Sequence, residues 1–286
     1  MKLAAALLPL AFALAAPAAA LASPAMIYDM GGKFDKSFNE AAYRGIERWK
    51  KETGKPVLEF EIANESQREQ ALRRMAERGA TPIIATGFAQ ASTVEKIAKE
   101  FPKLQFTVID GLVKLPNVQS VLFKEHEGSF LVGMIAALAS KTGKVGFVGG
   151  MDIPLIRKFQ CGYEQGVKYA NPKAEVFSNM VGTTGTAWND PARGGELARS
   201  QFAKGADVIF AAAGGSGIGV YQAAKDHKPG VVALGLKEDG VDYALDQNNA
   251  KLISPEMKKK VDQAKADIVA GKIKVADAMA DPACKY

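Results

Sequence analysis

Acidic, amide and aromatic side chains gather in residues 28–40, YDMGGKFDKSFNE, where a short apolar run ends and a helix begins. Asp29 follows the apolar run, and a glycine pair after it would let the backbone turn tightly. Phe38 is either a core residue or a flat platform for a planar ligand. Ligands of open α/β sheets bind beyond the carboxyl ends of the strands, so we expect Asp29, Ser37, Phe38 and Asn39 to lie in a binding site.

The same pattern follows three later apolar runs, which end in Gly87-Phe88, in Asp110-Gly111 and in the Trp-Asn-Asp of residues 188–190. Aromatic faces combined with a few carboxylates and amides suit a neutral, planar ligand, because rings can stack on a heterocycle while Asp accepts from its N–H groups. The candidate site therefore extends to Gly87, Asp110 and Trp188. For Trp188 the alternative is a loop aromatic that covers the core.

Catalytic chemistry has little support in the sequence. The two histidines, His126 and His227, lie near neither a cysteine nor a metal-like cluster, so a zinc site or a Ser-His-Asp arrangement is poorly supported. The glycine-rich residues 215–219, GSGIG, could cradle a phosphate, but position 220 is Val, which breaks the G-x-G-x-x-G spacing. A tight turn that borders a cleft through Gly215 is the favoured interpretation. We expect no cofactor, no metal and no enzymatic activity.

Short apolar runs alternate with amphipathic helices from residue 26 onward. The first series has predicted strands at residues 26–28, 57–61, 82–86, 105–109 and 118–123. The helix after the first strand places Phe38, Ile46 and Trp49 on one face, and either Asp35 or Ser37 can cap it. Short buried strands that alternate with helices indicate a parallel, doubly wound sheet.

A second series follows a helix at residues 127–141, whose small side chains suit close packing. Its elements are a strand at 144–150, a helix near 153–170, a strand near 175–180, a helix near 191–204, a strand and turn in 206–219, a strand at 231–236, and a helix capped by Ser254-Pro255. We therefore predict an α/β fold of two doubly wound parallel-sheet lobes facing a cleft. The predicted boundaries are an N-terminal lobe at 23–125, a C-terminal lobe at 126–230, and a segment at 231–286 that returns across the lobes.

Residues 1–22 have the pattern of a secretory signal peptide. Lys2 supplies the positive charge, an apolar stretch follows, and the sequence up to Ala22 fits a small-x-small cleavage site. Because no later apolar run reaches the ~20 residues that span a bilayer, we expect a soluble protein exported to the periplasm.

Charge and cysteine content narrow the choice of partners. The formal net charge is +6, but the basic residues are interspersed with acidic ones along the helices, so we expect no nucleic-acid partner. Cys161 and Cys284 form an even pair in an exported chain, which favours a disulfide that ties the C-terminal tail to the second lobe. Two free or buried thiols are the alternative.

Several motifs together resemble the basic membrane protein (Bmp) family, the substrate-binding components of ABC importers for purine nucleosides. The motifs are D-x-G-G-x-x-D-x-S-F-N at 29–39, IDG at 109–111, HEGSFLVGMIAAL at 126–138, KVGFVGG at 144–150, WNDPARGGELA at 188–198, GADVIFAAAGGSGIG at 205–219 and LGLKEDGVDYALD at 234–246. The resemblance implies a type I periplasmic binding fold and delivery of a small-molecule ligand to an ABC permease at the inner membrane. It further implies that Phe38 and Trp188 sandwich a purine while Asp29, Asn39 and Asp110 bond its edge. The family usually has Phe where Trp188 stands.

The chain departs from the family after residues 223–226. Where similar proteins continue with a strand, a crossover and a helix, this sequence passes almost directly to residues 227–230. The Asp and Lys that hold the ribose in similar proteins belong to that segment, and Lys237 and Glu238 are candidate substitutes. We expect lower stability or self-association, and a shift of preference from a nucleoside toward a free base or another planar heterocycle. Two alternative functions stay open: a nucleoside hydrolase or phosphorylase, and a ligand sensor that docks on a membrane receptor.

Overall fold

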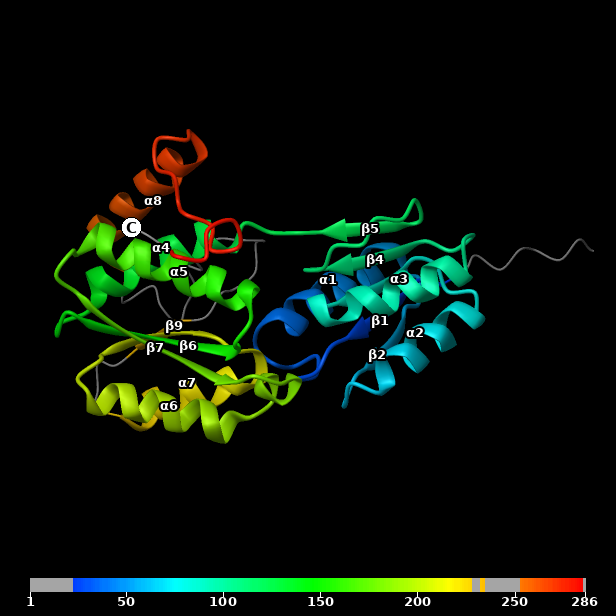
Figure 1. Ribbon diagram of the computed structural model, residues 1–286, viewed down its shortest axis with the longest axis horizontal. Helices are drawn as coiled ribbons and strands as arrows, with labels where there is room; N and C mark the ends of the chain where they lie inside the picture. The colour runs from blue at the N-terminus through cyan, green and yellow to red at the C-terminus, as the bar shows by residue number, and fades with distance from the viewer. Residues whose placement is uncertain (1–22, 228–231, 235–252, 285–286) are drawn as a thin grey trace, which may run out of the picture.

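Two lobes, each a parallel sheet covered by helices, lie side by side in the computed structural model, which describes residues 23–227, 232–234 and 253–284 (Figure 1). The first lobe has a five-stranded sheet in the order β2-β1-β3-β4-β5. Its elements are β1 (Ala25–Tyr28), α1 (Phe38–Thr53), β2 (Leu58–Glu61), α2 (Gln67–Glu77), β3 (Ile83–Thr86), the 3-10 turn η1 (Phe88–Gln90), α3 (Ala91–Glu100), β4 (Phe106–Ile109) and β5 (Val118–Val121).

Helices cover both faces of the first sheet. Ala25 and Ile27 of β1 pack in one core with residues of α2 and α3, whereas Met26 and Tyr28 pack on the opposite face with Ile46 of α1. This division follows from the alternation of side chains along a strand. All four strand pairings are parallel, as the sequence predicts for buried strands connected by helices.

The second lobe has a four-stranded parallel sheet in the order β7-β6-β8-β9. Its elements are α4 (Glu125–Ala139), β6 (Lys144–Met151), α5 (Pro154–Ala170), β7 (Glu175–Gly182), the 3-10 turn η2 (Gly185–Trp188), α6 (Pro191–Ala203), β8 (Val208–Ala212), the 3-10 turn η3 (Gly214–Ser216), α7 (Gly217–Asp226), β9 (Val232–Leu234) and α8 (Pro255–Val269). One face packs on α4 and α5, and the other packs on α6 and α7. The predicted α/β architecture of two parallel-sheet lobes is confirmed.

The element bounds agree with the predicted ones to within one or two residues in most places. The strand predicted at 118–123 ends at Val121, and the helix predicted from 127 begins at Glu125. Residues 227–231 alone separate α7 from β9, which leaves no room there for the additional strand and helix. The strand predicted at 231–236 is described only as Val232–Leu234, since residues 231, 235 and 236 lie outside the described residues.

Two helix starts show which side chain does the capping. At α1 the carboxylate of Asp35 accepts from the backbone N–H groups of Ser37, Asn39 and Glu40 at 2.8, 3.1 and 3.1 Å. Ser37 occupies the N-cap position without a side-chain bond, so Asp35 satisfies the free donors of the first turn. At α8 the hydroxyl of Ser254 accepts from the backbone N–H of Met257, as predicted.

Helices α4 and α5 pack closely because glycine stands where they cross. A Cβ on Gly133 would lie 2.1 Å from the backbone oxygen of Tyr163, and one on Gly166 would lie 1.9 Å from that of Phe130. Helix α8 stacks on the outer side of α4 (Figure 1) and packs through Val261. The described residues contain no helix whose length and apolar character would let it cross a membrane.

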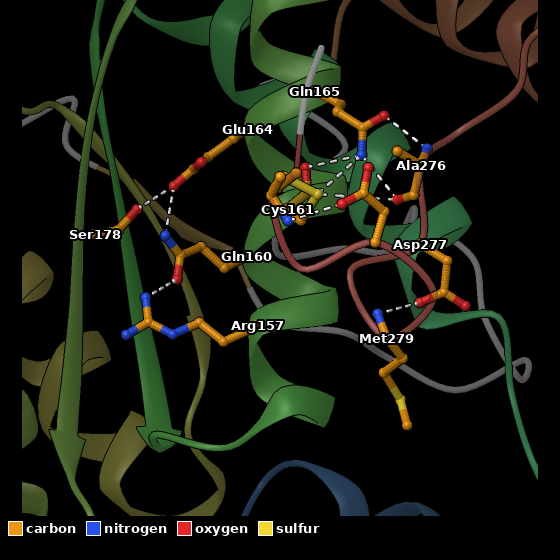
Figure 2. The surroundings of a disulfide bond; sticks show 12 residues. Arg157, Gln160, Cys161, Glu164, Gln165, Ser178, Ala276, Asp277 and Met279 are labelled. Carbon is orange, nitrogen blue, oxygen red and sulfur yellow. Dashed lines mark hydrogen bonds between the residues drawn. A yellow bond between two sulfur atoms is a disulfide. The ribbon is translucent and has the colours of Figure 1, made fainter.

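The segment after α8 is attached to α5. A disulfide joins Cys161 of α5 to Cys284, so the predicted disulfide is confirmed and the alternative of two thiols is wrong. Figure 2 shows Gln165, one turn along α5, bonded to the backbone of Ala276: its Oε1 accepts from the N–H at 2.7 Å and its Nε2 donates to the oxygen at 3.0 Å. Asp277 then approaches Lys158 of α5, with 3.7 Å between Oδ2 and Nζ.

Candidate ligand-binding cleft

A cavity of about 400 Å³ lies between the two lobes, beyond the carboxyl ends of the first-lobe strands. The first lobe lines it through the loop after β1, the start of α1, and the ends of β3 and β4. The second lobe lines it through the start of α5, η2 and the end of β8. The volume falls in the range of ~300–1,000 Å³ that is typical of small-molecule sites.

Seven of the eight residues predicted for the site line this one cavity. They are Asp29, Ser37, Phe38, Asn39, Gly87, Asp110 and Trp188. The eighth, Gly215, does not line it. Its neighbour Gly214 does, while a Cβ on Gly215 would lie 3.1 Å from the backbone oxygen of Trp188. The glycine-rich turn thus borders the cleft one residue earlier than predicted.

Asp29 is a buried carboxylate held by an arginine. Its Oδ1 accepts from both Nε and Nη2 of Arg68 at 3.2 and 3.1 Å, and both side chains are 11% exposed. Burial raises the pKa of Asp29 above its usual range, and the Arg68 guanidinium opposes that rise. Arg68 does not line the cavity, whereas Asp29 does, so the arginine contacts the carboxylate from outside.

Glycine 87 is required by this carboxylate. Its φ of +96° is a left-handed conformation, and a Cβ there would lie 2.8 Å from Oδ2 of Asp29. Any larger residue would displace the Asp29 side chain. Asn39 fixes the same loop: its Oδ1 accepts from the backbone N–H of Asp29 at 3.2 Å, and its Nδ2 donates to the backbone oxygen of Asp29 at 3.0 Å.

An aromatic side chain from each lobe lines the cavity. Phe38 begins α1, where the Asp35 cap fixes the first turn, and Trp188 ends η2. The indole ring of Trp188 lies over Gly150 of β6, at which a Cβ would come within 2.4 Å of the ring. Gly150 therefore leaves room for the Trp188 ring at the end of β6. The backbone of Trp188 is also held, because the hydroxyl of Ser216 donates to the oxygen of Ala187 and accepts from the N–H of Asp190.

Two carboxyls, those of Asp110 and Glu125, line the cavity where the chain crosses between the lobes. Asp110 follows β4 with a left-handed φ of +68°, and Glu125 begins α4; both line the cavity. Burial, together with the hydrogen bond and charge of Glu125, raises the pKa of Asp110 to about 7. Lys158 of α5 pairs with Glu125, with 2.7 Å between Nζ and Oε2, and donates to the backbone oxygen of Phe123 at 3.0 Å.

The two lobes touch at the rim of the cleft. A Cβ on Gly31 would lie 3.3 Å from the backbone oxygen of Trp188 in the other lobe, and one on Gly185 would lie 2.3 Å from Oε1 of Glu65. Such distances show loops packed directly against one another. Closed lobes exclude water from a ligand between them, which strengthens the hydrogen bonds made inside.

Sequence reasoning missed the contribution of several helices to the site. The structure adds Arg68 of α2, Glu125 of α4 and Lys158 of α5 as charged residues in or behind the wall. It also adds apolar lining residues, namely Met30, Phe123, Leu155, Ile156 and Phe159. Lys237 and Glu238, predicted as substitutes for the ribose ligands, lie outside the described residues. No group of three or more His, Cys, Asp or Glu side chains among the described residues could hold a metal ion.

The two lobes enclose a cavity of small-molecule size, and the comparisons agree with this geometry. Residues 22–273 match the family model Bmp, described as ABC transporter substrate-binding protein PnrA-like. The chain belongs to the Bmp family. The predicted resemblance is therefore confirmed, and the family is one of substrate-binding proteins rather than of enzymes.

Comparisons with individual proteins agree with membership of the Bmp family. This chain is 36% identical over 210 residues to the CD4+ T-cell-stimulating antigen of Listeria monocytogenes, and the match covers 71% of this chain and 58% of that protein. It is 32% identical over 206 residues to the ABC transporter nucleoside-binding protein BmpA of Lactococcus lactis, covering 70% of this chain and 58% of that protein. The chain thus spans less than two thirds of the length of these two relatives.

Among solved structures, the fold is similar to that of an ABC transporter solute-binding protein from Aeropyrum pernix K1. The TM-score is 0.74 at 25% identity, covering 88% of this chain and 92% of that one. A two-lobed solute-binding fold is therefore shared with a protein that differs from this one at three quarters of the aligned positions.

Proposed function

We propose that this protein binds a purine nucleoside, or a related planar heterocycle, between its lobes and delivers it to an ABC permease at the inner membrane. The observation that carries the proposal is the cavity between the lobes that is lined by Phe38 of one lobe, Trp188 of the other and the two carboxyls of Asp29 and Asp110. The Bmp family membership and the nucleoside-binding name of the Lactococcus lactis relative support it.

Aromatic side chains from opposite lobes couple binding to closure. A flat ring held between Phe38 and Trp188 would gain stacking only when both lobes contact it, each aromatic contact contributing ~0.5–1.5 kcal/mol beyond the buried area. The ligand would therefore stabilise the closed state, in which the two rim loops touch. A permease can recognise that state without contacting the ligand.

The carboxyls of Asp29 and Asp110, at the ends of β1 and β4, would orient the ligand in the cleft. Buried polar groups reject a ligand that cannot pair with them, because an unpaired buried donor or acceptor costs ~1–3 kcal/mol. Such a cleft would prefer a neutral hydrogen-bonding ring over a sugar or an aliphatic amino acid.

Export is part of the proposal. ABC substrate-binding proteins are exported proteins, and we propose that cleavage after the predicted signal at residues 1–22 yields a soluble periplasmic protein. Mass spectrometry of the protein recovered from the periplasm tests this, with a mature start near Ser23 as the expected result. A protein retained in the cytoplasm with its first residues intact would contradict it.

The test of the ligand is a thermal-shift and calorimetry screen of residues 23–286 against purine and pyrimidine bases and nucleosides. We expect a purine-selective rise of the melting temperature, lost in both Phe38→Ala and Trp188→Ala. Phe34→Ala is the matched control, because Phe34 is 61% exposed and does not line the cavity. A folded protein that responds to none of these compounds would refute the proposal. Release of ribose from inosine would instead favour the hydrolase or phosphorylase alternative.

A further inference from the structure

The two acidic side chains of the cleft lie two strands apart. Asp29 follows β1 and Asp110 follows β4, with β3 between them in the sheet. Neighbouring strands are ~4.8 Å apart, so strands two places apart are separated by about 10 Å. A ligand of one or two fused rings between them can therefore meet a different carboxyl at each edge.

Burial raises the pKa of Asp29, but Asp29 has a cationic partner that favours its ionised form. The Arg68 guanidinium makes two hydrogen bonds to Oδ1, and a paired arginine in a mostly buried position stabilises the carboxylate. The remaining oxygen, Oδ2, faces Gly87, a cavity-lining residue. An ionised carboxylate is an acceptor only, so Asp29 can receive a hydrogen bond from the ligand but cannot donate one.

Asp110 has the opposite surroundings. Its carboxyl is hydrogen-bonded to that of Glu125, and its Oδ1 is buried with no hydrogen-bond partner among the described residues. Two carboxyls in contact share a proton, because both cannot ionise at low cost. Lys158 pairs with Glu125 at 2.7 Å, whereas Asp110 makes no salt bridge to a lysine or arginine among the described residues, so burial favours the protonated form of Asp110.

Other charged groups near the pair leave this assignment unchanged. Asp277 reaches Lys158 at 3.7 Å from the side of the C-terminal tail, and Lys158 lowers the pKa of Asp110 less than burial and Glu125 raise it. His126 follows Glu125 on α4, and burial lowers its pKa, which favours a neutral ring. Asp29 lies across the cavity with its charge balanced by Arg68.

We infer that the cleft reads its ligand with two carboxyls in opposite protonation states: Asp29, held ionised by Arg68, accepts from the ligand, and Asp110, kept protonated by Glu125, donates to it. Glu125 and Arg68 are then positioning residues: they determine specificity through the protonation states of Asp110 and Asp29. The matching ligand is a neutral heterocycle with an N–H donor at one edge and an unprotonated ring nitrogen or carbonyl oxygen at the other. The inference rests on the proposed function and narrows its ligand class.

The affinity for the ligand should then fall as the pH rises. Only the protein fraction with protonated Asp110 is competent, so the apparent Kd rises in inverse proportion to that fraction. With a pKa of about 7, affinity for adenosine, which does not titrate in this range, should be about 30-fold weaker at pH 8.5 than at pH 6. Calorimetry across this pH range, in buffers of different ionisation enthalpy, should show proton uptake on binding above pH 7.

Isosteric variants separate the two roles. Asp110→Asn keeps a donor toward the ligand at every pH, so the affinity that it retains should not change with pH. Asp29→Asn should bind at least tenfold more weakly at all pH values, because Arg68 holds the amide oxygen and turns the amide donors toward the ligand's own donor. Glu125→Gln should move the midpoint of the profile to lower pH, whereas Glu127→Gln, on the same helix and paired with Lys124, should leave it in place.

A ligand-free measurement tests the protonation directly. Carbon-detected NMR of the Asp110 carboxyl should show a midpoint near pH 7, absent in Asp110→Asn and lowered in Glu125→Gln. Ionised Asp110 at pH 6, or purine binding with a flat wild-type pH profile, would overturn the inference alone. Failure of the wild type to bind adenosine, inosine, adenine or guanine at any pH would overturn the proposed function and this inference with it.

Discussion

Removing the guanidinium of Arg68 should destabilise the first lobe in a pH-dependent way. In Arg68→Met the side chain keeps a similar length but can no longer donate to the buried carboxylate of Asp29. A buried charge that loses its partner costs ~3–5 kcal/mol. Because both side chains retain 11% exposure, we expect the lower end, about 3 kcal/mol at pH 8.

The pH dependence follows from the protonation of Asp29. Burial already raises its pKa, with Arg68 opposing the rise, so the variant should have a still higher value. A carboxyl with a raised folded-state pKa costs stability above that pKa, and the cost disappears as the acid is protonated at lower pH. The difference between variant and wild type should therefore be largest at pH 8 and shrink toward pH 4.5.

Thermal and urea unfolding of ligand-free protein measure this difference. A loss of about 3 kcal/mol lowers the melting temperature by about 6–12 °C in a domain of 150 or more residues. Arg73→Met is the control: Arg73 also lies on α2 and binds a carboxylate, Glu100, at 2.6 Å, but at the surface, and surface pairs contribute little. Adding Asp29→Asn to Arg68→Met should recover most of the stability. A pH-independent loss, or an Arg68→Met protein as stable as the wild type at pH 8, would refute the reasoning.

Three further changes test other parts of the structure. Gly150→Ala places a methyl group 2.4 Å from the Trp188 ring, so it should displace the indole and weaken purine binding more than tenfold in calorimetry while the far-ultraviolet circular dichroism stays unchanged. Asp35→Ala removes the acceptor for three backbone N–H groups at the start of α1 and should cost ~1–2 kcal/mol in urea unfolding; a wild-type midpoint would contradict the capping role. Reduction of the disulfide between Cys161 and Cys284, which are 123 residues apart, should lower the free energy of unfolding by ~2–4 kcal/mol. If the melting temperature in dithiothreitol is unchanged while both thiols can be titrated, the disulfide does not stabilise the attachment of the C-terminal tail.

The ends of the strands could be predicted because buried runs and the polar residues after them carry a strong signal. Short apolar runs fix β1, β3 and β4, and parallel strands must end at one edge. Asp29, Asp110 and the helix start at Phe38 followed directly from that rule, and the structure brings all three to one cavity. Their roles toward a ligand remain predictions.

The charged residues behind the cavity wall could not be predicted in the same way. Arg68 lies among other basic and acidic residues of α2, and nothing in that pattern distinguishes the side chain that turns inward from those that face water. Glu125 begins α4 and Lys158 lies on α5, whereas Asp110 follows β4 of the first lobe. Only the tertiary arrangement brings these three side chains to the same wall. Phe159 of α5 has the spacing of a core residue, and its exposure to the cavity depends on how the lobes meet.

Helix α5 has a different neighbour on nearly every side, and this limits how the protein can evolve. Phe159 faces the cavity, Gly166 admits α4, Gln165 and Cys161 hold the tail, and Tyr163 fills the core. A mutation that enlarged the cavity from this side would disturb at least one of those other contacts within a turn. Changes of ligand preference among descendants of this protein should therefore accumulate in the loops of the first lobe, where a substitution has fewer structural side effects.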